Sequence, residues 1–156
     1  MMRRLIFSLS VIILTIACGT LSPAEQAEQA RKIRTALDER RYKIDVRMMY
    51  PRHGPSKSVA SNWSLEVRGD TLVSYLPYIG RAYNIPYGGG KGMNFTALIG
   101  SYTEEKGRKG ERLITMSVDN EEDQFVYRVE VFSDGQATID VQPRERESIS
   151  YSGELE

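Results

Sequence analysis

Side chains that could carry out catalysis are scarce in this chain, because its 156 residues include one Cys and one His. Because the one Cys is predicted to carry a lipid, as argued below, no free thiol remains for thiol–imidazole catalysis, and the lack of a second His excludes a His-rich zinc site. His53 lies in the turn-like stretch Pro51-Arg52-His53-Gly54-Pro55, where a Ser–His–acid triad is the remaining nucleophilic arrangement. Paired carboxylates would have to face each other across a cleft about 5–10 Å wide to hydrolyse glycosides. We therefore expect no enzyme and no catalytic residue.

Two further segments have the composition of ligand sites without the spacing. The acidic run from Asp119 to Asp123 could hold calcium, but it lacks the Gly and the final Glu of an EF-hand loop. The Gly-rich run from Gly88 to Gly92 lacks the spacing of a phosphate-binding loop. We therefore predict a solvated acidic turn, no metal site and no cofactor.

The segment Leu76–Gly92 is the strongest candidate for a ligand site. It holds two prolines, which are incompatible with a central strand, and three tyrosines around one arginine. In one interpretation Tyr78, Tyr83 and Tyr87 offer stacking surfaces and Arg81 binds an anion. In the other, the segment plugs one end of a β-barrel and Arg81 satisfies carbonyl groups.

The one thiol of the chain lies at the end of an apolar N-terminal stretch. Arg3 and Arg4 precede the run Leu5–Ala17, which is shorter than the about 20 residues that a bilayer requires. This order of charge and hydropathy is typical of a signal peptide. The sequence Leu14-Thr15-Ile16-Ala17-Cys18 resembles the bacterial lipobox, in which the Cys receives a lipid through a thioether.

Lipidation of Cys18 would place the protein in the bacterial cell envelope, anchored in a membrane and facing the periplasm. No acidic run follows Cys18 to indicate export to the cell surface, although surface exposure is not excluded. The alternative is an ordinary secretory signal with a Cys near its end. We predict a signal peptide over 1–17, a lipidated Cys and short tether over 18–22, and a single β-rich domain over 23–156.

An N-terminal helix is predicted over 23–40. Ser22 can cap it, Pro23 suits its first position, and Glu25 completes a capping box. Small Ala residues dominate the apolar face, and Ile33 and Leu37 are its large members. This helix should therefore pack weakly on the rest of the domain.

From Tyr42 onward the apolar residues recur at every second position, as in strands with one buried face. Gly69-Asp70 and Asp134-Gly135 are hairpin turns within this pattern. The mixed-charge run from Glu104 to Arg112 is predicted to be a solvent loop. The fold class is mainly β (α+β), with about eight antiparallel strands in a lipocalin-like barrel or a strongly curved sheet and one N-terminal helix.

Two motifs in the chain resemble a known family. The string Leu-Pro-Tyr-Ile-Gly-Arg-Ala-Tyr from Leu76 to Tyr83 and the ending Ile-Ser-Tyr-Ser-Gly from Ile149 to Gly153 resemble the Bacteroidetes lipoprotein family catalogued as domain of unknown function 4251. The resemblance covers roughly residues 25–155. It implies an exported β-rich domain of the cell envelope, and it carries over no catalytic residue.

The balance of 21 basic and 21 acidic residues leaves no positive excess for a nucleic acid partner. We expect a non-catalytic lipoprotein whose partners are the membrane, through the lipid on Cys18, and a small apolar or anionic ligand. The alternative is a protein-interaction or scaffolding lipoprotein of the envelope. The sequence leaves the oligomeric state open. An enclosed apolar cavity would favour the first function, and a filled interior with an exposed apolar patch would favour the second.

Overall fold

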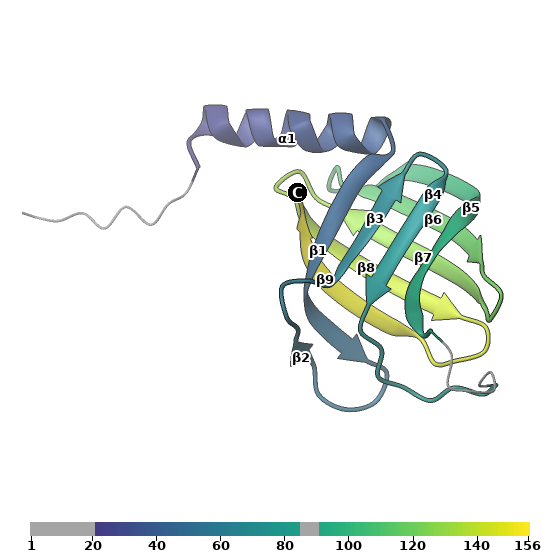
Figure 1. Cartoon of the computed structure of the whole chain (residues 1–156). Coiled ribbons are helices and arrows are strands. Elements are labelled where there is room, and N and C mark those ends of the chain that lie inside the picture. Colours follow the sequence, from purple (N-terminus) through teal and green to yellow (C-terminus); the bar gives the residue numbers. More distant parts are fainter. Residues whose placement is uncertain (1–20, 85–90) are drawn as a thin grey trace, which may run out of the picture.

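The structure, a computed structural model, describes residues 21–84 and 91–156 and consists of one helix and nine strands (Figure 1). The helix is α1 (Pro23–Asp38), and the first strands are β1 (Arg41–Pro51), β2 (Lys57–Ser58), β3 (Ser64–Arg68) and β4 (Thr71–Leu76). The others are β5 (Met93–Lys106), β6 (Arg112–Asp119), β7 (Gln124–Val131), β8 (Gln136–Pro143) and β9 (Ile149–Leu155). No helix in the described part of the chain is long and apolar enough to span a membrane.

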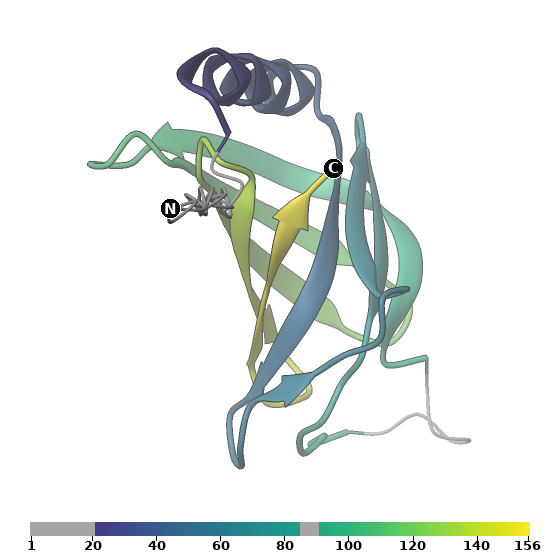
Figure 2. The same cartoon turned by 90° about the vertical axis from the view of Figure 1, so that its left-hand side faces the viewer.

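The strands form a closed barrel rather than an open curved sheet. Each strand from β3 to β8 pairs antiparallel with the next in sequence, and β1 pairs with both β3 and β9. The β1–β9 pairing joins the two ends of the sheet, so eight strands make the barrel wall and β2 is an extra strand beside β1. The predicted barrel with one N-terminal helix is therefore confirmed (Figures 1 and 2).

The predicted capping box starts α1. The Ser22 side chain accepts from the backbone N–H of Glu25, and the Glu25 carboxylate accepts from the backbone N–H of Ser22. The helix ends at Asp38, earlier than predicted, because Arg40 takes a left-handed conformation with φ of 51° that turns the chain into β1. Of its residues, Ile33 and Leu37 are buried, and the helix lies across one end of the barrel (Figure 1).

Side chains fill the barrel interior. The largest fully buried ones are Tyr127, Tyr151 and Phe125, and every strand of the wall adds at least one buried Leu, Ile, Val or Met. The Tyr127 hydroxyl donates to Ser74 Oγ at 3.1 Å, and Ser74 Oγ donates to the Met93 carbonyl at 2.7 Å. Burial raises the pKa of both Tyr127 and Tyr151 well above the ordinary tyrosine value. This packing differs from a lipocalin-like interior that holds a ligand.

The predicted solvent loop from Glu104 to Arg112 is wrong in part. Strand β5 continues to Lys106 and β6 begins at Arg112, so the loop is shorter than its composition indicates. Glu111 is buried, and its carboxylate accepts from the backbone N–H of Lys109 at 2.8 Å. Most of these charged residues lie on two paired strands. The order of residues along the chain does not reveal that pairing, so the run looks like a solvated loop in the sequence.

Gly153 allows β9 to approach β1 closely at the seam. A Cβ atom at this position would overlap the Asp45 carbonyl oxygen and lie 2.8 Å from the carbonyl carbon. The register of β1 against β9 shifts between Val46 and Met48, directly beside this contact. The glycine at the end of the Ile149–Gly153 motif thus permits the close approach of β9 to β1 that closes the barrel.

We expect Gly153→Ala to lower the free energy of unfolding by about 3 kcal/mol or more, because the obstacle is backbone that cannot move aside. Gly100→Ala is the matched control, since its Cβ would meet its nearest atoms at 3.5 Å. That variant should change stability by less than about 1 kcal/mol. Urea unfolding of both variants measures the difference, and equal losses would show that the close approach at the seam is not limiting.

Candidate functional site

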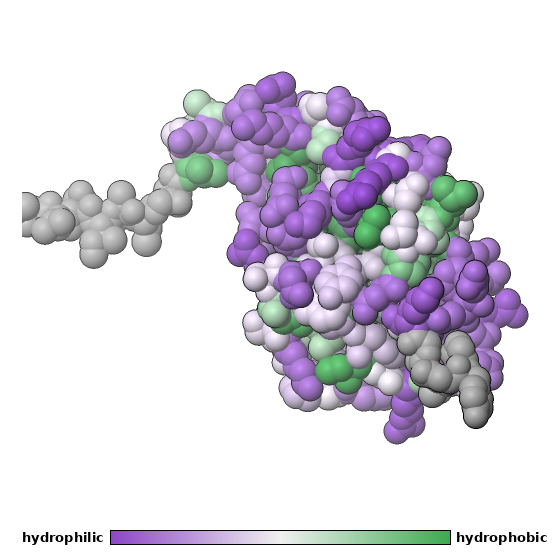
Figure 3. Space-filling model, viewed as in Figure 1, coloured by the Kyte–Doolittle hydropathy of each residue, from purple (hydrophilic) through white to green (hydrophobic). Residues whose placement is uncertain are grey.

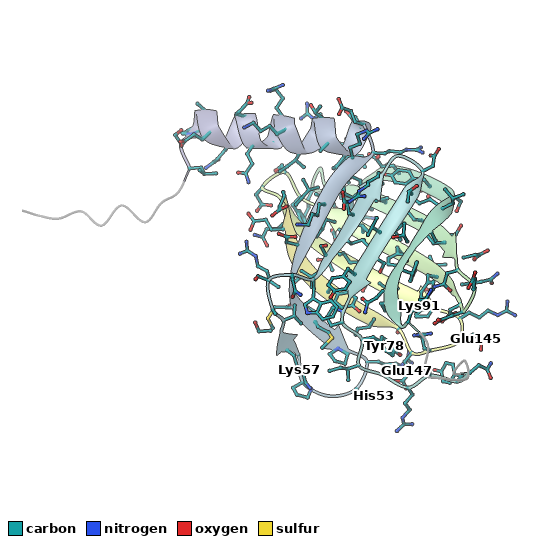
Figure 4. The ribbon with its side chains drawn as sticks, viewed as in Figure 1. His53, Lys57, Tyr78, Lys91, Glu145 and Glu147 are labelled. Atoms are coloured by element: carbon teal, nitrogen blue, oxygen red, sulfur yellow. The ribbon has the colours of Figure 1, made fainter. Side chains whose placement is uncertain are left out.

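The tyrosine and arginine segment lies at the barrel end opposite α1. Figure 4 places Tyr78 there with His53, Glu145 and Glu147. The chain from Pro77 to Asn84 runs beside the β8–β9 loop, and Ala82 and Arg146 form a β-bridge. Tyr83 N–H donates to the Glu145 carbonyl at 2.7 Å. The segment and the loop therefore cover this end of the barrel together.

Tyr78 has contacts that stabilise this cover. Its hydroxyl donates to the carbonyl oxygens of Arg81 at 3.1 Å and Glu147 at 3.0 Å. The ring folds back over Gly80, where a Cβ would lie 2.8 Å from Tyr78 Cζ. The buried Tyr151 hydroxyl also reaches this segment and donates to the Pro77 carbonyl at 2.7 Å. These contacts match the interpretation in which the segment plugs the barrel.

Arg81 joins the cover through its backbone rather than its guanidinium. Arg81 N–H donates to Glu147 Oε2 at 3.1 Å, and Glu147 N–H donates to the Arg81 carbonyl at 2.9 Å. The side chains of Arg81 and Tyr83 are exposed. Their exposure leaves them accessible to a ligand, but the structure does not gather them around a common hollow.

Two of the predicted site residues fall outside the described part of the chain. Tyr87 belongs to residues 85–90, and Cys18 belongs to residues 1–20. The predicted ligand set of Tyr78, Arg81, Tyr83 and Tyr87 can therefore be followed at its first three members. The lipidation site stays a prediction from sequence.

His53 lies beside the cover without forming a triad. Its Nε2 atom is 3.5 Å from Glu147 Oε1, and its side chain is largely exposed. No hydrogen bond between His53 and a serine occurs among the described residues. Residues 21–84 and 91–156 contain no group of three or more His, Cys, Asp or Glu side chains that could hold a metal ion.

The acidic turn is not uniformly solvated, which corrects the sequence-based prediction for Asp123. The Asp123 side chain is fully buried, and Oδ1 accepts from the backbone N–H groups of Gln124, Arg144 and Glu145. Its Oδ2 accepts from Arg146 Nε at 3.1 Å. The sequence did not predict the burial of Asp123 and Arg146, because acidic turns and mixed-charge loops are usually exposed.

A hollow lies outside the barrel, at the α1 end, opposite the cover formed by Pro77–Asn84 and the β8–β9 loop. It is a groove of about 600 Å³ between α1, the β5–β6 hairpin and the β7–β8 turn. We name it the α1 groove, and its lining is Ala30, Ile33, Arg34, Leu37, Glu104, Glu105, Lys106, Lys109, Gly110, Arg112, Val131, Phe132 and Ser133. The helix residues Ala30, Ile33, Arg34 and Leu37 share one face, as the spacing of an α-helix requires.

Two polar contacts fix the helix above the α1 groove. Gln29 Nε2 donates to the Asp134 carbonyl at 2.9 Å, and an Arg112 guanidinium nitrogen donates to Asp38 Oδ1 at 2.8 Å. Arg112 also pairs with Glu104. The groove therefore has a defined width, although α1 buries few large side chains.

The rim of the α1 groove carries uncompensated positive charge. Arg34, Lys106 and Lys109 form no ion pair in the described part of the chain, whereas Arg112 has Asp38 and Glu104 as partners. Glu105 is the remaining acidic side chain of the lining. Such a groove can attract an anion to a site whose lining also includes apolar residues such as Ile33 and Phe132.

We expect Tyr78→Phe to destabilise the protein by about 1 kcal/mol or more, because two backbone carbonyls lose a donor. Arg81→Ala should change stability by less than about 0.5 kcal/mol, since Arg81 contacts Glu147 through its backbone. Urea unfolding measures both variants. An equal loss in Arg81→Ala would assign its guanidinium to the cover, and an Arg81→Ala protein that folds normally but loses a bound anion would assign it to a ligand.

Comparison with known proteins yields a fold and a family. The structure is similar to the crystal structure of a DUF4251 family protein from Bacteroides eggerthii DSM 20697, with a TM-score of 0.64 and 18% sequence identity. The similarity covers 85% of this chain and 89% of that chain, and at this identity it supports the fold alone. No curated protein matches the chain. The family model described as domain of unknown function (DUF4251) matches residues 24–155, so this chain belongs to the DUF4251 family.

Proposed function

We propose that this protein is a non-catalytic lipoprotein of the bacterial cell envelope that binds an anionic amphiphile in the α1 groove. The observation that carries the ligand is the combination of apolar lining residues with three basic side chains that have no ion pair among the described residues, Arg34, Lys106 and Lys109. The barrel interior is a weaker candidate because packed side chains occupy it. The groove's volume of about 600 Å³ lies within the range usual for small-molecule sites.

The anchor is proposed from the N-terminal sequence. Lipid on Cys18 would hold the protein in the membrane, because several buried acyl chains at about 0.8 kcal/mol per CH₂ give stable attachment. The helix begins at Pro23, only a few residues after Cys18. This short tether would keep the α1 end of the barrel, and with it the groove, near the membrane surface.

The surface of α1 is compatible with this placement. Hydrophilic side chains cover its solvent-facing side, so it is not a helix that inserts into lipid (Figure 3). Arg31, Lys32 and Arg34 follow Glu25 and Glu28 along the helix. The positive half of α1 is therefore the half that packs on the barrel and lines the groove.

We expect Cys18→Ser to move the protein from the membrane fraction to the soluble periplasmic fraction. The wild-type chain should carry the mass of a lipid on Cys18, and the variant should lack it. Fractionation combined with mass spectrometry measures both properties. Retention of the variant in the membrane at unchanged electrophoretic mobility would contradict lipidation.

The ligand can be tested with the chain from residue 19 onward and two probes: monomeric lysophosphatidylglycerol and inorganic phosphate. Lys106→Ala/Lys109→Ala should weaken binding of the lipid about tenfold or more, since it removes two charge-assisted contacts. Lys32→Ala is the matched control, because Lys32 lies on α1 away from the groove lining. Native mass spectrometry and calorimetry measure the affinity.

The two probes separate the contributions of head and tail. Binding of the lysolipid but not of phosphate would support an amphiphile ligand, whereas equal affinities would reduce the site to an anion site. Equal weakening by Lys32→Ala would indicate general attraction between charges. Absence of lysolipid binding would exclude this function for the groove.

The second candidate function is interaction with another envelope protein. It is favoured by the filled interior and by exposed apolar side chains on the barrel, among them Leu98, which is 72% exposed, and Tyr83, which is 66% exposed. Exposed apolar residues of this kind are typical of contact surfaces when they adjoin a hollow or a strand edge.

A further inference from the structure

Strand β5 pairs with β4 along its first part and with β6 along its second part. Its residues Met93–Leu98 pair with β4, and Ile99–Lys106 pair with β6. The register against β6 shifts between Ile99 and Ser101, and β6 ends at Asp119. Among the described residues, no strand lies on the second side of β5 from Asn94 to Ala97, because Asp119 at the end of β6 lies opposite Leu98.

The hydrogen-bond pattern identifies which backbone N–H and C=O groups of β5 have no partner strand. Ile99 N–H donates to the Asp70 carbonyl, which lies at the β4 side of the strand. Because N–H and C=O groups alternate sides along an antiparallel strand, those of Asn94, Thr96 and Leu98 point away from β4. Asn94 N–H bonds to the Lys91 carbonyl. Thr96 is then the centre of a short open edge.

A hollow of about 310 Å³ runs along this edge, and we name it the β5 slot. Phe95 and Ala97 point into the barrel and line the slot, and the β6–β7 turn with Asn120 and Glu121 lines its other wall. Phe95 packs against Phe125 with ring centroids 4.8 Å apart. The slot therefore exposes apolar core side chains beside unpaired backbone groups.

The turn that forms the opposite wall is held in place. Asn120 Oδ1 accepts from the backbone N–H groups of Glu122 and Asp123, each at 2.8 Å. Glu122 accepts from Lys91 N–H at 3.0 Å and lies 3.8 Å from Arg146. Glu121 and Asp119 are exposed and have no ion pair within the described part of the chain. The β6–β7 side of the slot is consequently acidic, and Lys91 is the basic residue of the slot lining.

We propose that the β5 edge from Asn94 to Ala97 binds an extended segment of a partner protein by strand addition. Backbone pairing at Thr96 would place the alternate side chains of that segment over Phe95 and Ala97, where aliphatic residues fit. A Lys or Arg next to them would meet Glu121 and Asp119. The neighbouring side chains would cover Leu98 on the outer face of the sheet.

The slot favours a peptide segment over a second copy of this chain. The wall formed by Asn120 and Glu121 lies across the slot from the β5 edge, and the slot has a volume of only about 310 Å³. A second barrel approaching with its own β5 edge would bring its own acidic rim and turn into that space. The inference rests on the second candidate function and not on the α1 groove.

The test uses the full chain in detergent micelles and a fluorescent peptide, Lys-Val-Thr-Val-Thr-Val-Lys. Thr96→Pro removes the central N–H, and Thr96→Val is the matched control that keeps the backbone donor. Thr96→Pro should weaken binding by about tenfold or more, and Thr96→Val should retain affinity within about twofold. Fluorescence anisotropy measures binding, and the lysolipid affinity of each variant reports whether the α1 groove is intact.

Two further measurements keep the proposal testable if Thr96→Pro does not fold. The same peptide with alternate amides N-methylated should lose binding to the wild-type chain, and Glu121→Lys should weaken binding of the unmodified peptide. Peptide should also slow hydrogen exchange at the Thr96 amide. Binding that is indifferent to N-methylation, absence of peptide binding to the folded wild-type chain whatever its lysolipid affinity, or Thr96 protection that depends on protein concentration alone would overturn the proposal.

Discussion

The pairing of β1 with β9 is the constraint on which the other features of this protein depend. Without it, both strands would present open edges, and the inward side chains of each would face solvent at the gap. Closure creates a different requirement, since a barrel packed with Tyr, Phe, Leu and Met has two ends that need covers. Ile33 and Leu37 of α1 cover one end, and Tyr78 with the β8–β9 loop covers the other.

The two covers are held by different kinds of interaction. At the α1 end, two large apolar side chains and two polar contacts suffice, which leaves a groove beside them. At the far end, Asp123 binds three backbone N–H groups and Arg146, and so fixes the loop against which Pro77–Asn84 lies. Removing one partner of such a buried pair generally costs about 3–5 kcal/mol. Buried charged residues therefore stabilise segments of this protein that the sequence indicates to be solvent-exposed.

Sequence patterns predicted what depends on neighbours along the chain. Alternating apolar residues gave the strands, Asp134-Gly135 marked a hairpin, and Ser22 with Glu25 capped α1, because each of these is decided within a few residues. Contacts between distant residues were not predictable. The burial of Asp123 depends on Arg146 across the barrel end, and the open edge of β5 depends on where β6 stops. The α1 groove likewise arises from three segments that no local pattern connects.

The length of β5 links the closure to the proposed binding surfaces. The long strand β5 pairs with β4 up to Leu98 and with β6 from Ile99 onward. The irregularity between Ile99 and Ser101 lies where this change occurs. Beyond it, β5 contributes to the hairpin that carries Lys106 and Lys109 at the α1 end; before it, the strand leaves the edge at Thr96 near the opposite end. If the anchor holds α1 near the membrane, the basic groove faces lipid and the β5 edge is on the part of the barrel that other proteins can reach. The same strand would then serve both surfaces, and the lining of neither includes a residue of the β1–β9 pairing that closes the barrel.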